Sequence, residues 1–229
     1  MFVDTETTGL CDMRTPYTSQ TLNEVWPFLT QIAWSIISYD ENLQNQGLAS
    51  SNSHFIKPRF SPSQLPQDVI DKTHITYNLL QEQGDDSLPI LTEFFNHLTL
   101  VDAVVAHNTT FDMKVIKAEA LRLGLDNHMR IKPWLDTCYY GLQLTKLKTP
   151  QGRSKFPKLQ ELYNFIEAPK GFPQGRIEDS SHRADADVNS LIICFDGLTQ
   201  LPAESPVITP LRFQRILQKH SEKYQEVNV

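Results

Sequence analysis

The sequence predicts an α/β or α+β domain built around a mixed β-sheet, and three observations support this fold class. Segments of strand type come first, and strands then alternate with helical segments. The chain has 229 residues, the length of one large domain or of one domain with an extension, and it can bury a core without disulfides or structural metals. Its composition, 40% hydrophobic and 21% charged, argues against a disordered, collagen-like or coiled-coil protein.

In the first half of the chain, hydrophobic patterning predicts strands over residues 2–5, 29–39 and 53–57. The stretch 40–52, rich in Asn, Gln and Ser, is expected to connect the last two strands, and the polar stretch 11–29 is expected to be irregular.

The middle of the chain is expected to change from helical to strand structure. Residues 66–99 contain helical segments, of which 89–98 is the clearest, and the apolar run 101–106 is typical of a buried strand. A helix over 109–123 and a short strand ending over 134–137 follow.

The second half is mainly helical, with helices predicted over 157–166, 184–198 and 209–224. The last helix begins with Thr209-Pro210, an N-cap residue followed by proline in the first turn. Residues 146–176 are expected to form a long loop interrupted by one helix, and long loops in compact domains are often functional.

We predict a main domain over 1–198 and a helical appendage over 199–229, packed on the domain or docking from it. The apolar face of the appendage would contain Leu211, Ile216, Leu217 and Tyr224, and packing on its own domain is the default interpretation.

Several classes of protein are disfavoured by composition. The longest apolar run, 32–37, is too short to span a bilayer. The first six residues contain two acids and no basic or apolar segment, so we expect no signal peptide. Three cysteines, at positions 11, 138 and 194, are an odd number at distant spacings, which is typical of a reduced cytosol. We therefore expect a cytoplasmic protein that does not bind membranes.

The first motif with chemical potential is FVDTETTG at residues 2–9. Asp4 and Glu6 are two residues apart, so on a strand both carboxylates point to one face. They would repel each other unless a cation neutralises them, and they would lie at the carboxyl end of a strand, where α/β sheets bind ligands. A solvated sheet edge is the alternative, because a single D-x-E in a chain with 27 acids carries little weight.

The second motif is AHNTTFD at residues 106–112, where a buried strand leads into a helix. Asp112 is expected in the first helical turn. The alternative is purely structural, since Thr109-x-x-Asp112 has the form of a capping box and an acid favours that end of the helix dipole. We assign Asn108 mainly to capping the helix.

The third motif is SHRADADV at residues 181–188, followed by an apolar stripe at helical spacing. Asp187 lies beside that stripe, whereas Asp185 is rotated by about 200° and points away, so Asp187 is the preferred candidate. His182 is expected on the loop or in the first turn, and a surface histidine in front of a helix is the alternative.

Together the three motifs supply four carboxylates and one histidine from a strand end, a helix start and a loop–helix junction. This is the inventory of a two-metal phosphodiester hydrolase. Hard cations such as Mg²⁺ take oxygen ligands, and two such ions about 3.5–4 Å apart clamp the attacking and leaving oxygens. A histidine can remove the proton from the attacking water.

The segments FVDTETTG, AHNTTFD and HRADAD resemble, in order and in their His-x-Ala-x-x-Asp spacing, the three motifs of the DEDDh 3′→5′ exonuclease family of the proofreading type. The resemblance spans residues 2 to about 198, which would make 1–198 an exonuclease domain. It implies an α/β, ribonuclease-H-like fold with a five-stranded mixed sheet flanked by helices.

The resemblance also implies roles at matching positions. Asp4, Glu6 and Asp187 would hold a first metal ion, Asp4 would bridge to a second, and Asp112 would reach the second ion through water. His182 would be the general base. The implied cofactors are two Mg²⁺ or Mn²⁺ ions.

For the substrate, the resemblance implies that a Thr7 backbone N–H lies near the terminal 3′-OH and that Leu10 and His107 contact the last base or sugar. The expected reaction releases nucleoside 5′-monophosphates from single-stranded or frayed DNA. An RNA-directed 3′→5′ exoribonuclease is an alternative, because nothing in the motifs reads the 2′-OH. A polymerase-associated proofreading or docking subunit is another, and a DNA polymerase is a possible partner.

The stretch after the first motif, 11–28, is longer than the turn usual in this family. Its aromatic residues Tyr17, Trp26 and Phe28 could stack on bases, but packing over the sheet is the favoured interpretation.

Charge is distributed unevenly. The net charge is −6, yet residues 130–176 contain nine basic and three acidic residues, whereas residues 1–100 contain four basic and twelve acidic ones. Metal ions would reverse the local sign of the acidic cluster. The distribution predicts a small footprint of a few nucleotides at a nucleic-acid 3′ end with a basic lip from 130–176, and it argues against a long, salt-sensitive duplex groove.

Overall fold

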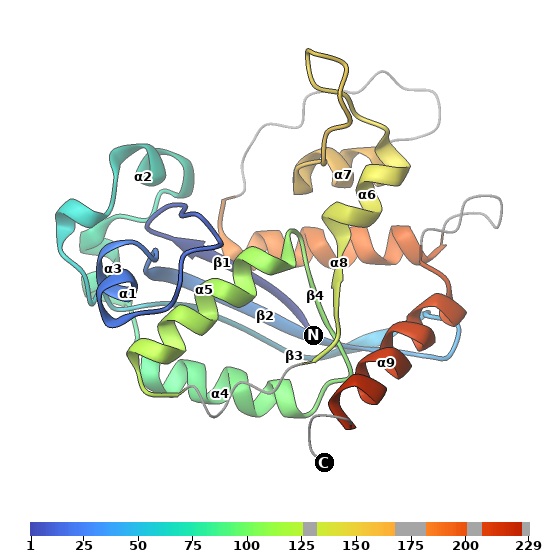
Figure 1. Cartoon of the computed structure of the whole chain (residues 1–229), viewed down its shortest axis with the longest axis horizontal. Coiled ribbons are helices and arrows are strands. Elements are labelled where there is room, and N and C mark those ends of the chain that lie inside the picture. Colours follow the sequence, from blue (N-terminus) through green and yellow to red (C-terminus); the bar gives the residue numbers. More distant parts are fainter. Residues whose placement is uncertain (126–131, 168–181, 201–207, 226–229) are drawn as a thin grey trace.

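The computed structural model describes residues 1–125, 132–167, 182–200 and 208–225, with side chains up to residue 221. Within these residues one mixed sheet forms the centre of the molecule (Figure 1). In spatial order its five strands are β3 (Asn45–Phe55), β2 (Leu29–Tyr39), β1 (Phe2–Thr7), β4 (Val104–Ala106) and β5 (Trp134–Asp136). β1 pairs antiparallel with β2 and parallel with β4. The predicted five-stranded mixed sheet flanked by helices is confirmed.

Helices cover both faces of this sheet. On one face, α4 (Ser87–Thr99) and α5 (Thr109–Arg122) form a core with strand residues that include Val3, Ile32 and Trp34. On the other face, a second core joins Phe2 and Val105 to four helices, which are α6 (Thr137–Thr145), α7 (Leu159–Glu167), α8 (Ala184–Gln200) and α9 (Pro210–Gln225). Because strand side chains alternate, successive residues of β1 face α5 and α8 in turn.

β3 is much longer than predicted. It pairs with β2 along nearly its whole length, from Tyr39 opposite Asn45 to Gln31 opposite Phe55. The polar, mostly exposed residues at its start match a loop by composition, but backbone pairing to the eleven-residue β2 imposes a strand there. A polar edge strand of this kind also discourages pairing with other chains.

A small lobe stands beside the sheet at the left of Figure 1. It contains η1 (Pro62–Gln64), α2 (Gln67–Thr73) and α3 (Tyr77–Gln83) around a separate apolar cluster. The members of that cluster are Phe28, Phe60, Leu65, Ile75 and Leu80. This lobe accounts for the first part of the helical region predicted over 66–99.

Two α-helices of the described residues were not predicted. α1 (Ser19–Glu24) buries no residue and is held by a capping box between Thr18 and Thr21, so it has no apolar stripe to recognise. α6 contains a glycine and two tyrosines, which are poor helix formers. Its N-terminus is capped by Asp136, whose carboxylate accepts a hydrogen bond from the Cys138 backbone at 3.0 Å.

The 11–28 segment packs on the protein, as favoured from the sequence. Trp26 and Phe28 are buried, and the Tyr17 ring stacks on the Trp26 ring with a centroid distance of 4.5 Å. Arg122 of α5 anchors the segment through hydrogen bonds to its backbone. Its guanidinium donates to three backbone carbonyls, those of Leu22, Trp26 and Pro27.

α9 packs on the second core through Phe213, Ile216 and Leu217. Of the apolar face predicted for the appendage, Ile216 and Leu217 are in this contact, Leu211 is exposed, and the Tyr224 side chain lies outside the described part. The division of the chain after residue 198 stays a prediction. Among the described residues, no helix has the length and hydropathy needed to cross a membrane.

Candidate active site

The carboxyl end of β1 carries the first motif on both of its faces. Asp4 and Glu6 are partly buried and share the face that looks toward α8, while Thr5 between them is buried on the α5 side. The pairing with β2 shifts register between Glu6 and Thr7, so the regular pairing of β1 ends directly after the two acids and the strand ends at Thr7.

Three hydrogen bonds hold the turn that follows. Thr7 Oγ1 donates to the Gly9 carbonyl at 2.7 Å, and Thr8 exchanges two hydrogen bonds with the Phe28 backbone at 2.9 and 3.0 Å. Gly9 has φ +148°, a conformation that favours glycine over residues with a Cβ. The turn leaves Leu10 87% exposed.

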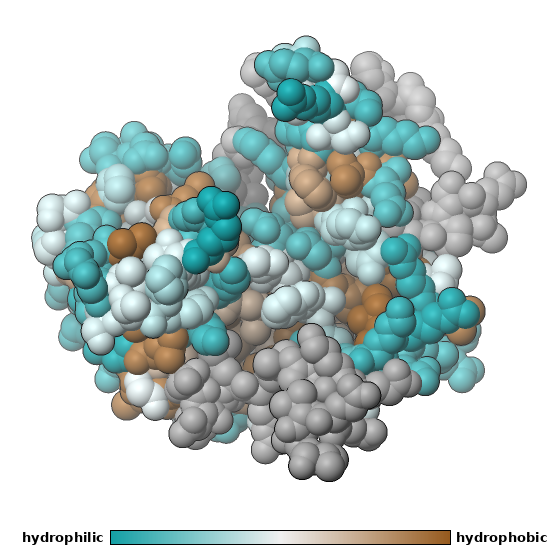
Figure 2. All heavy atoms as spheres, in the orientation of Figure 1, coloured by the Kyte–Doolittle hydropathy of each residue, from teal (hydrophilic) through white to brown (hydrophobic). Residues whose placement is uncertain are grey.

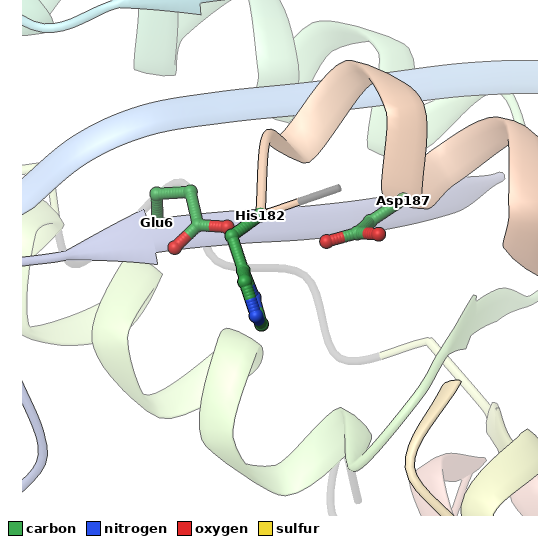
Figure 3. Close-up of side chains that lie close together, drawn as sticks. All are labelled: Glu6, His182 and Asp187. Carbon is green, nitrogen blue, oxygen red and sulfur yellow. The ribbon is translucent and has the colours of Figure 1, made fainter. Parts of the chain in front are cut away.

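Asp187 and His182 approach this strand from the start of α8. Glu6, His182 and Asp187 each place a potential ligand atom within 4.8 Å of the others (Figure 3). Asp185 does not join them, because its carboxylate accepts from Gln31 Nε2 at 3.3 Å and from Arg183 Nε at 3.2 Å. The helical rotation that separates the two aspartates therefore directs Asp187, and not Asp185, toward β1.

Asp112 reaches the same strand from the opposite face. It lies in the first turn of α5, its side chain is only 3% exposed, and its Oδ1 accepts a hydrogen bond from Thr5 Oγ1 at 2.8 Å. Thr5 was not singled out from the sequence. Its only signal there is its position between two acids on a strand, which places its side chain on the other face.

The N-cap position of α5 is predicted correctly, but the side-chain caps expected from its own sequence do not form. Asn108 occupies the N-cap position in the left-handed conformation, and its side chain makes no cap hydrogen bond. Thr109 is the first helical residue, and its hydroxyl donates to the Leu135 carbonyl. The carboxylate of Asp136 instead accepts from the backbone N–H groups of Asn108 and Thr109, at 2.9 and 3.2 Å. A cap supplied by β5 leaves Asp112 free of the capping-box role.

Burial and mutual repulsion disfavour the ionised forms of the clustered carboxyl groups, and this raises their pKa values. Burial, and then the charges of Asp187 and Asp112, raises the pKa of Glu6 to about 8. Burial raises the pKa of Asp112 to about 7, against the opposing effect of the Thr5 hydrogen bond. The pKa of Asp4 is also raised, by burial and by the three neighbouring carboxylates. Within the described residues, no lysine or arginine forms an ion pair with Asp4, Glu6 or Asp112.

This donor set fits a hard divalent cation. Oxygen ligands dominate it, one imidazole is within reach, and a cation would remove the mutual repulsion of the carboxylates. Glu6, His182 and Asp187 are compact enough to surround one ion. Asp4 and Asp112 lie beside that group and are available to a neighbouring position.

His107 lines the same cleft, but its ring is already engaged by the protein. Nδ1 lies 3.0 Å from Thr137 Oγ1 and Nε2 lies 2.9 Å from the Pro157 carbonyl. A carbonyl can only accept, so Nε2 carries the proton. Burial lowers the pKa of His107, which keeps the ring neutral.

A cleft of about 760 Å³ opens above the acidic cluster. The cleft is lined by Asp4, His182 and Asp187, by Leu10, and by residues of α6 and of the segment before α7. In Figure 2 this end of the molecule is hollowed between the lobe at the left and the upper part that carries α6 and α7. The basic lip predicted over 130–176 is described only in part, since 130–131 and 168–176 lie outside the described residues.

Comparison with known proteins agrees with this fold. The chain matches a family model described as RNase_T, exonuclease, over residues 1–195. It is similar to a structure of Exonuclease I from Methylocaldum szegediense, with 20% identity and a TM-score of 0.61, covering 90% of this chain and 41% of that one. E. coli Exonuclease I in complex with a dA16 oligonucleotide has 19% identity and a TM-score of 0.52, covering 86% and 40%.

A full-length 3′-exonuclease is also similar, with 13% identity and a TM-score of 0.56, covering 87% of this chain and 59% of that one. The chain thus spans about two fifths of the length of the Exonuclease I structures. No curated protein sequence matches it. The family match leaves out only the tail after residue 195, and it includes all three acidic motifs. It confirms the resemblance to 3′→5′ exonucleases, and the chain belongs to the RNase_T exonuclease family.

Proposed function

We propose that this chain is a divalent-metal-dependent 3′→5′ exonuclease that removes nucleotides from single-stranded or frayed DNA. The observation that carries the proposal is the clustering of Asp4, Glu6, Asp112, His182 and Asp187, from β1, α5 and the start of α8, beside a cleft that Asp4, His182 and Asp187 line. Family membership supports a nuclease, and structural relatives crystallised with DNA oligonucleotides support a DNA strand as the substrate.

The five residues divide into metal-holding and proton-handling roles. Asp4, Glu6 and Asp187 would hold a first ion, and Asp112 would serve a second ion with Asp4 shared between them. The chemistry supplied by Mg²⁺ or Mn²⁺ at these positions is polarisation of the phosphate and a lowered pKa of a bound water. The protein contributes a fixed, partly buried set of oxygens, which Thr5 helps to orient through Asp112.

His182 would act as the general base. It would accept a proton from the attacking water while the water oxygen bonds to phosphorus and the bond from phosphorus to the 3′ oxygen of the preceding nucleotide breaks. That 3′ oxygen takes a proton from solvent and becomes the new 3′-OH. The terminal residue leaves as a nucleoside 5′-monophosphate. In the variant His182→Ala we expect a strong loss of turnover with near-normal Mn²⁺ binding by calorimetry, whereas loss of Mn²⁺ binding would make His182 a ligand instead.

Substrate contacts are proposed for three residues of the cleft. Leu10 would pack on the terminal base or sugar, since it is exposed at the cleft on a stiff turn. The Thr7 backbone N–H would lie near the 3′-OH. His107 has both ring nitrogens engaged, so its contact with the last nucleotide would use the ring face.

The test uses single-stranded DNA, duplex DNA and RNA labelled at the 3′ or the 5′ end, with Mg²⁺ or with EDTA. For the unmodified protein we expect EDTA-sensitive, stepwise loss from the 3′ end. Asp4→Ala should abolish it, while Asp185→Ala is the matched control, because Asp185 lies on α8 outside the cluster. Activity that persists in Asp4→Ala, or cleavage from the 5′ end, would contradict the proposal. A clear preference for RNA would replace DNA with the exoribonuclease alternative.

A further inference from the structure

Residues 146–158 form a projecting hairpin, here called the basic hairpin, which rises between α6 and α7 at the top of Figure 1. Its two arms are joined by backbone hydrogen bonds from Thr149 to Arg153 at 2.8 Å and from Lys155 to Leu147 at 2.9 Å. Gly152 closes the turn with φ +76°. The prediction of a long loop over this stretch is therefore too simple, because the loop folds back on itself as a defined arm.

The base of the hairpin is built into the wall of the active-site cleft. The Pro157 carbonyl lies 2.9 Å from His107 Nε2 and 3.5 Å from Cys138 Sγ. A Cβ at Gly141 of α6 would lie 2.8 Å from Pro157 Cγ, so glycine permits this close packing. Glu161 of α7 accepts from the Lys158 backbone at 2.8 Å. The last residues of the arm, 156–158, line the cleft directly.

The hairpin is strongly basic in an acidic protein. It contains five basic residues and no acidic residue, whereas the chain has a net charge of −6. Lys155 is paired with Glu161 at 2.5 Å. The other four, Lys146, Lys148, Arg153 and Lys158, are exposed, and their side chains form no ion pair within the described residues. Such charges do little for folding and are available to a polyanion.

Two exposed aromatic side chains stand at the foot of this arm. Tyr139 of α6 is 51% exposed and Phe156 of the hairpin is 54% exposed, and both line the cleft. Aromatic faces next to basic side chains are the combination that binds single-stranded nucleic acid, where the bases stack and the cations contact phosphates. In a duplex the bases are stacked on each other, so exposed ring faces at this position favour a single strand.

We propose that the basic hairpin, with Tyr139 and Phe156, binds the nucleotides on the 5′ side of the scissile bond. Lys146, Lys148, Arg153 and Lys158 contact successive phosphates, and the two rings stack on bases as the strand leaves the cleft. This inference rests on the proposed function, because that function places the 3′ end at the acidic cluster. The basic hairpin and Tyr139, together called the single-strand track, act only on substrates long enough to reach the hairpin.

The test compares two variants that lose the same charge. Lys148→Ala with Arg153→Ala removes two cations from the hairpin, and Arg215→Ala with Lys219→Ala removes two exposed cations from α9. The substrates are a dinucleotide and an oligothymidylate of about 12 nucleotides, within the usual range of single-strand sites. Thermal unfolding checks that each variant is folded.

We expect the hairpin variant to raise KM for the oligothymidylate about 10-fold or more at low salt. The slope of log affinity against log salt should become shallower by roughly 1.4, the value for two lost phosphate contacts on a single strand. Turnover of the dinucleotide should be unchanged. Tyr139→Leu and Phe156→Leu should weaken oligothymidylate binding without changing the salt slope.

Binding is measured as well, by fluorescence anisotropy of labelled oligothymidylate in EDTA, so the track can be tested separately from catalysis. A protein that binds through the hairpin without degrading DNA would refute the proposed function and leave the track standing. The track is refuted if the two double variants behave alike, if the hairpin variant slows the dinucleotide as much as the oligothymidylate, or if duplex DNA binds the hairpin better than single strands.

Discussion

The hydrogen bond between Thr5 and Asp112 is a sharp test of how the site is assembled. Thr5 Oγ1 donates to Asp112 Oδ1 at 2.8 Å, and both side chains are buried. Thr5→Val keeps the branched shape and removes the donor. The substitution therefore changes the orientation and basicity of one acidic residue without touching any other member of the cluster.

The size of the effect follows from the kind of bond that is lost. A hydrogen bond to a charged group contributes about 1.5–3 kcal/mol, which corresponds to roughly 10–150-fold in an equilibrium constant. Loss of an outer partner of a metal-binding residue typically costs about 10–100-fold in metal affinity or activity. Because the Thr5 hydrogen bond lowers the pKa of Asp112, the variant should also retain a proton there more readily.

The assay is a Mg²⁺ titration of DNA degradation at neutral pH, with Mn²⁺ affinity measured by calorimetry. We expect the Mg²⁺ concentration for half-maximal rate to rise about 10–100-fold in Thr5→Val. Thr30→Val is the matched control, because Thr30 lies buried on neighbouring β2 and its hydroxyl has no hydrogen-bond partner among the described residues. The control should keep the normal metal dependence and equal or greater stability.

Two results would refute this reasoning. An unchanged metal dependence in Thr5→Val would mean that Asp112 does not contribute to the metal site in the way proposed. An equal shift in Thr30→Val would mean that metal dependence responds to any change in the sheet core rather than to the lost hydrogen bond.

Three further predictions concern stability and the cleft. Arg122→Ala leaves the buried Glu119 without its ion-pair partner and the backbone carbonyls of Leu22, Trp26 and Pro27 without their donor. It should lower the free energy of unfolding by about 3–5 kcal/mol, a fall in Tm of roughly 6–20 °C by calorimetry. A smaller fall would mean that the pair is not needed to hold the 11–28 segment. In EDTA, the free energy of unfolding should decline as pH rises from 3.8 to about 8, because the pKa of Glu6 is raised from 4.5 to about 8 and that of Asp112 from 3.8 to about 7. Both groups hold their protons more tightly in the folded state, so their ionisation favours unfolding. The Tm measured across this pH range should vary less with Mg²⁺, and a Tm independent of pH in EDTA would contradict the repulsion between the carboxylates. Leu10→Ala should raise KM several-fold with little change in Tm, since its side chain is exposed, and normal kinetics would exclude it from substrate contact.

The parts of the fold that follow from local periodicity could be predicted from the sequence. The period of two along β1 places Asp4 and Glu6 on one face, and the period of 3.6 along α8 separates Asp187 from Asp185. β2 was predicted with the bounds that it has in the structure. In β1 and α8 the period of the element fixes the face that each residue takes, whereas β2 is recognised as a run of mostly apolar residues whose first seven are all buried.

The parts that depend on partners distant in the sequence could not be predicted. The cap of α5 is supplied by Asp136, 28 residues after Asn108. The ring of His107 is satisfied by Thr137 and by Pro157, 50 residues away. The start of β3 is fixed by pairing rather than by its own side chains. Such contacts leave no pattern in the local sequence, because residues of these types are equally common in loops.

The alternation along β1 makes correct strand pairing a condition for assembling the site. Asp4 and Glu6 are presented to α8 and Thr5 to α5 by three consecutive residues of the central strand. A slip of β1 by one residue would exchange the faces, directing Thr5 toward α8 and the acids toward the apolar core under α5. Metal binding would thus discriminate the native pairing of the central strand from every pairing displaced by an odd number of residues, and it would favour the native one during folding.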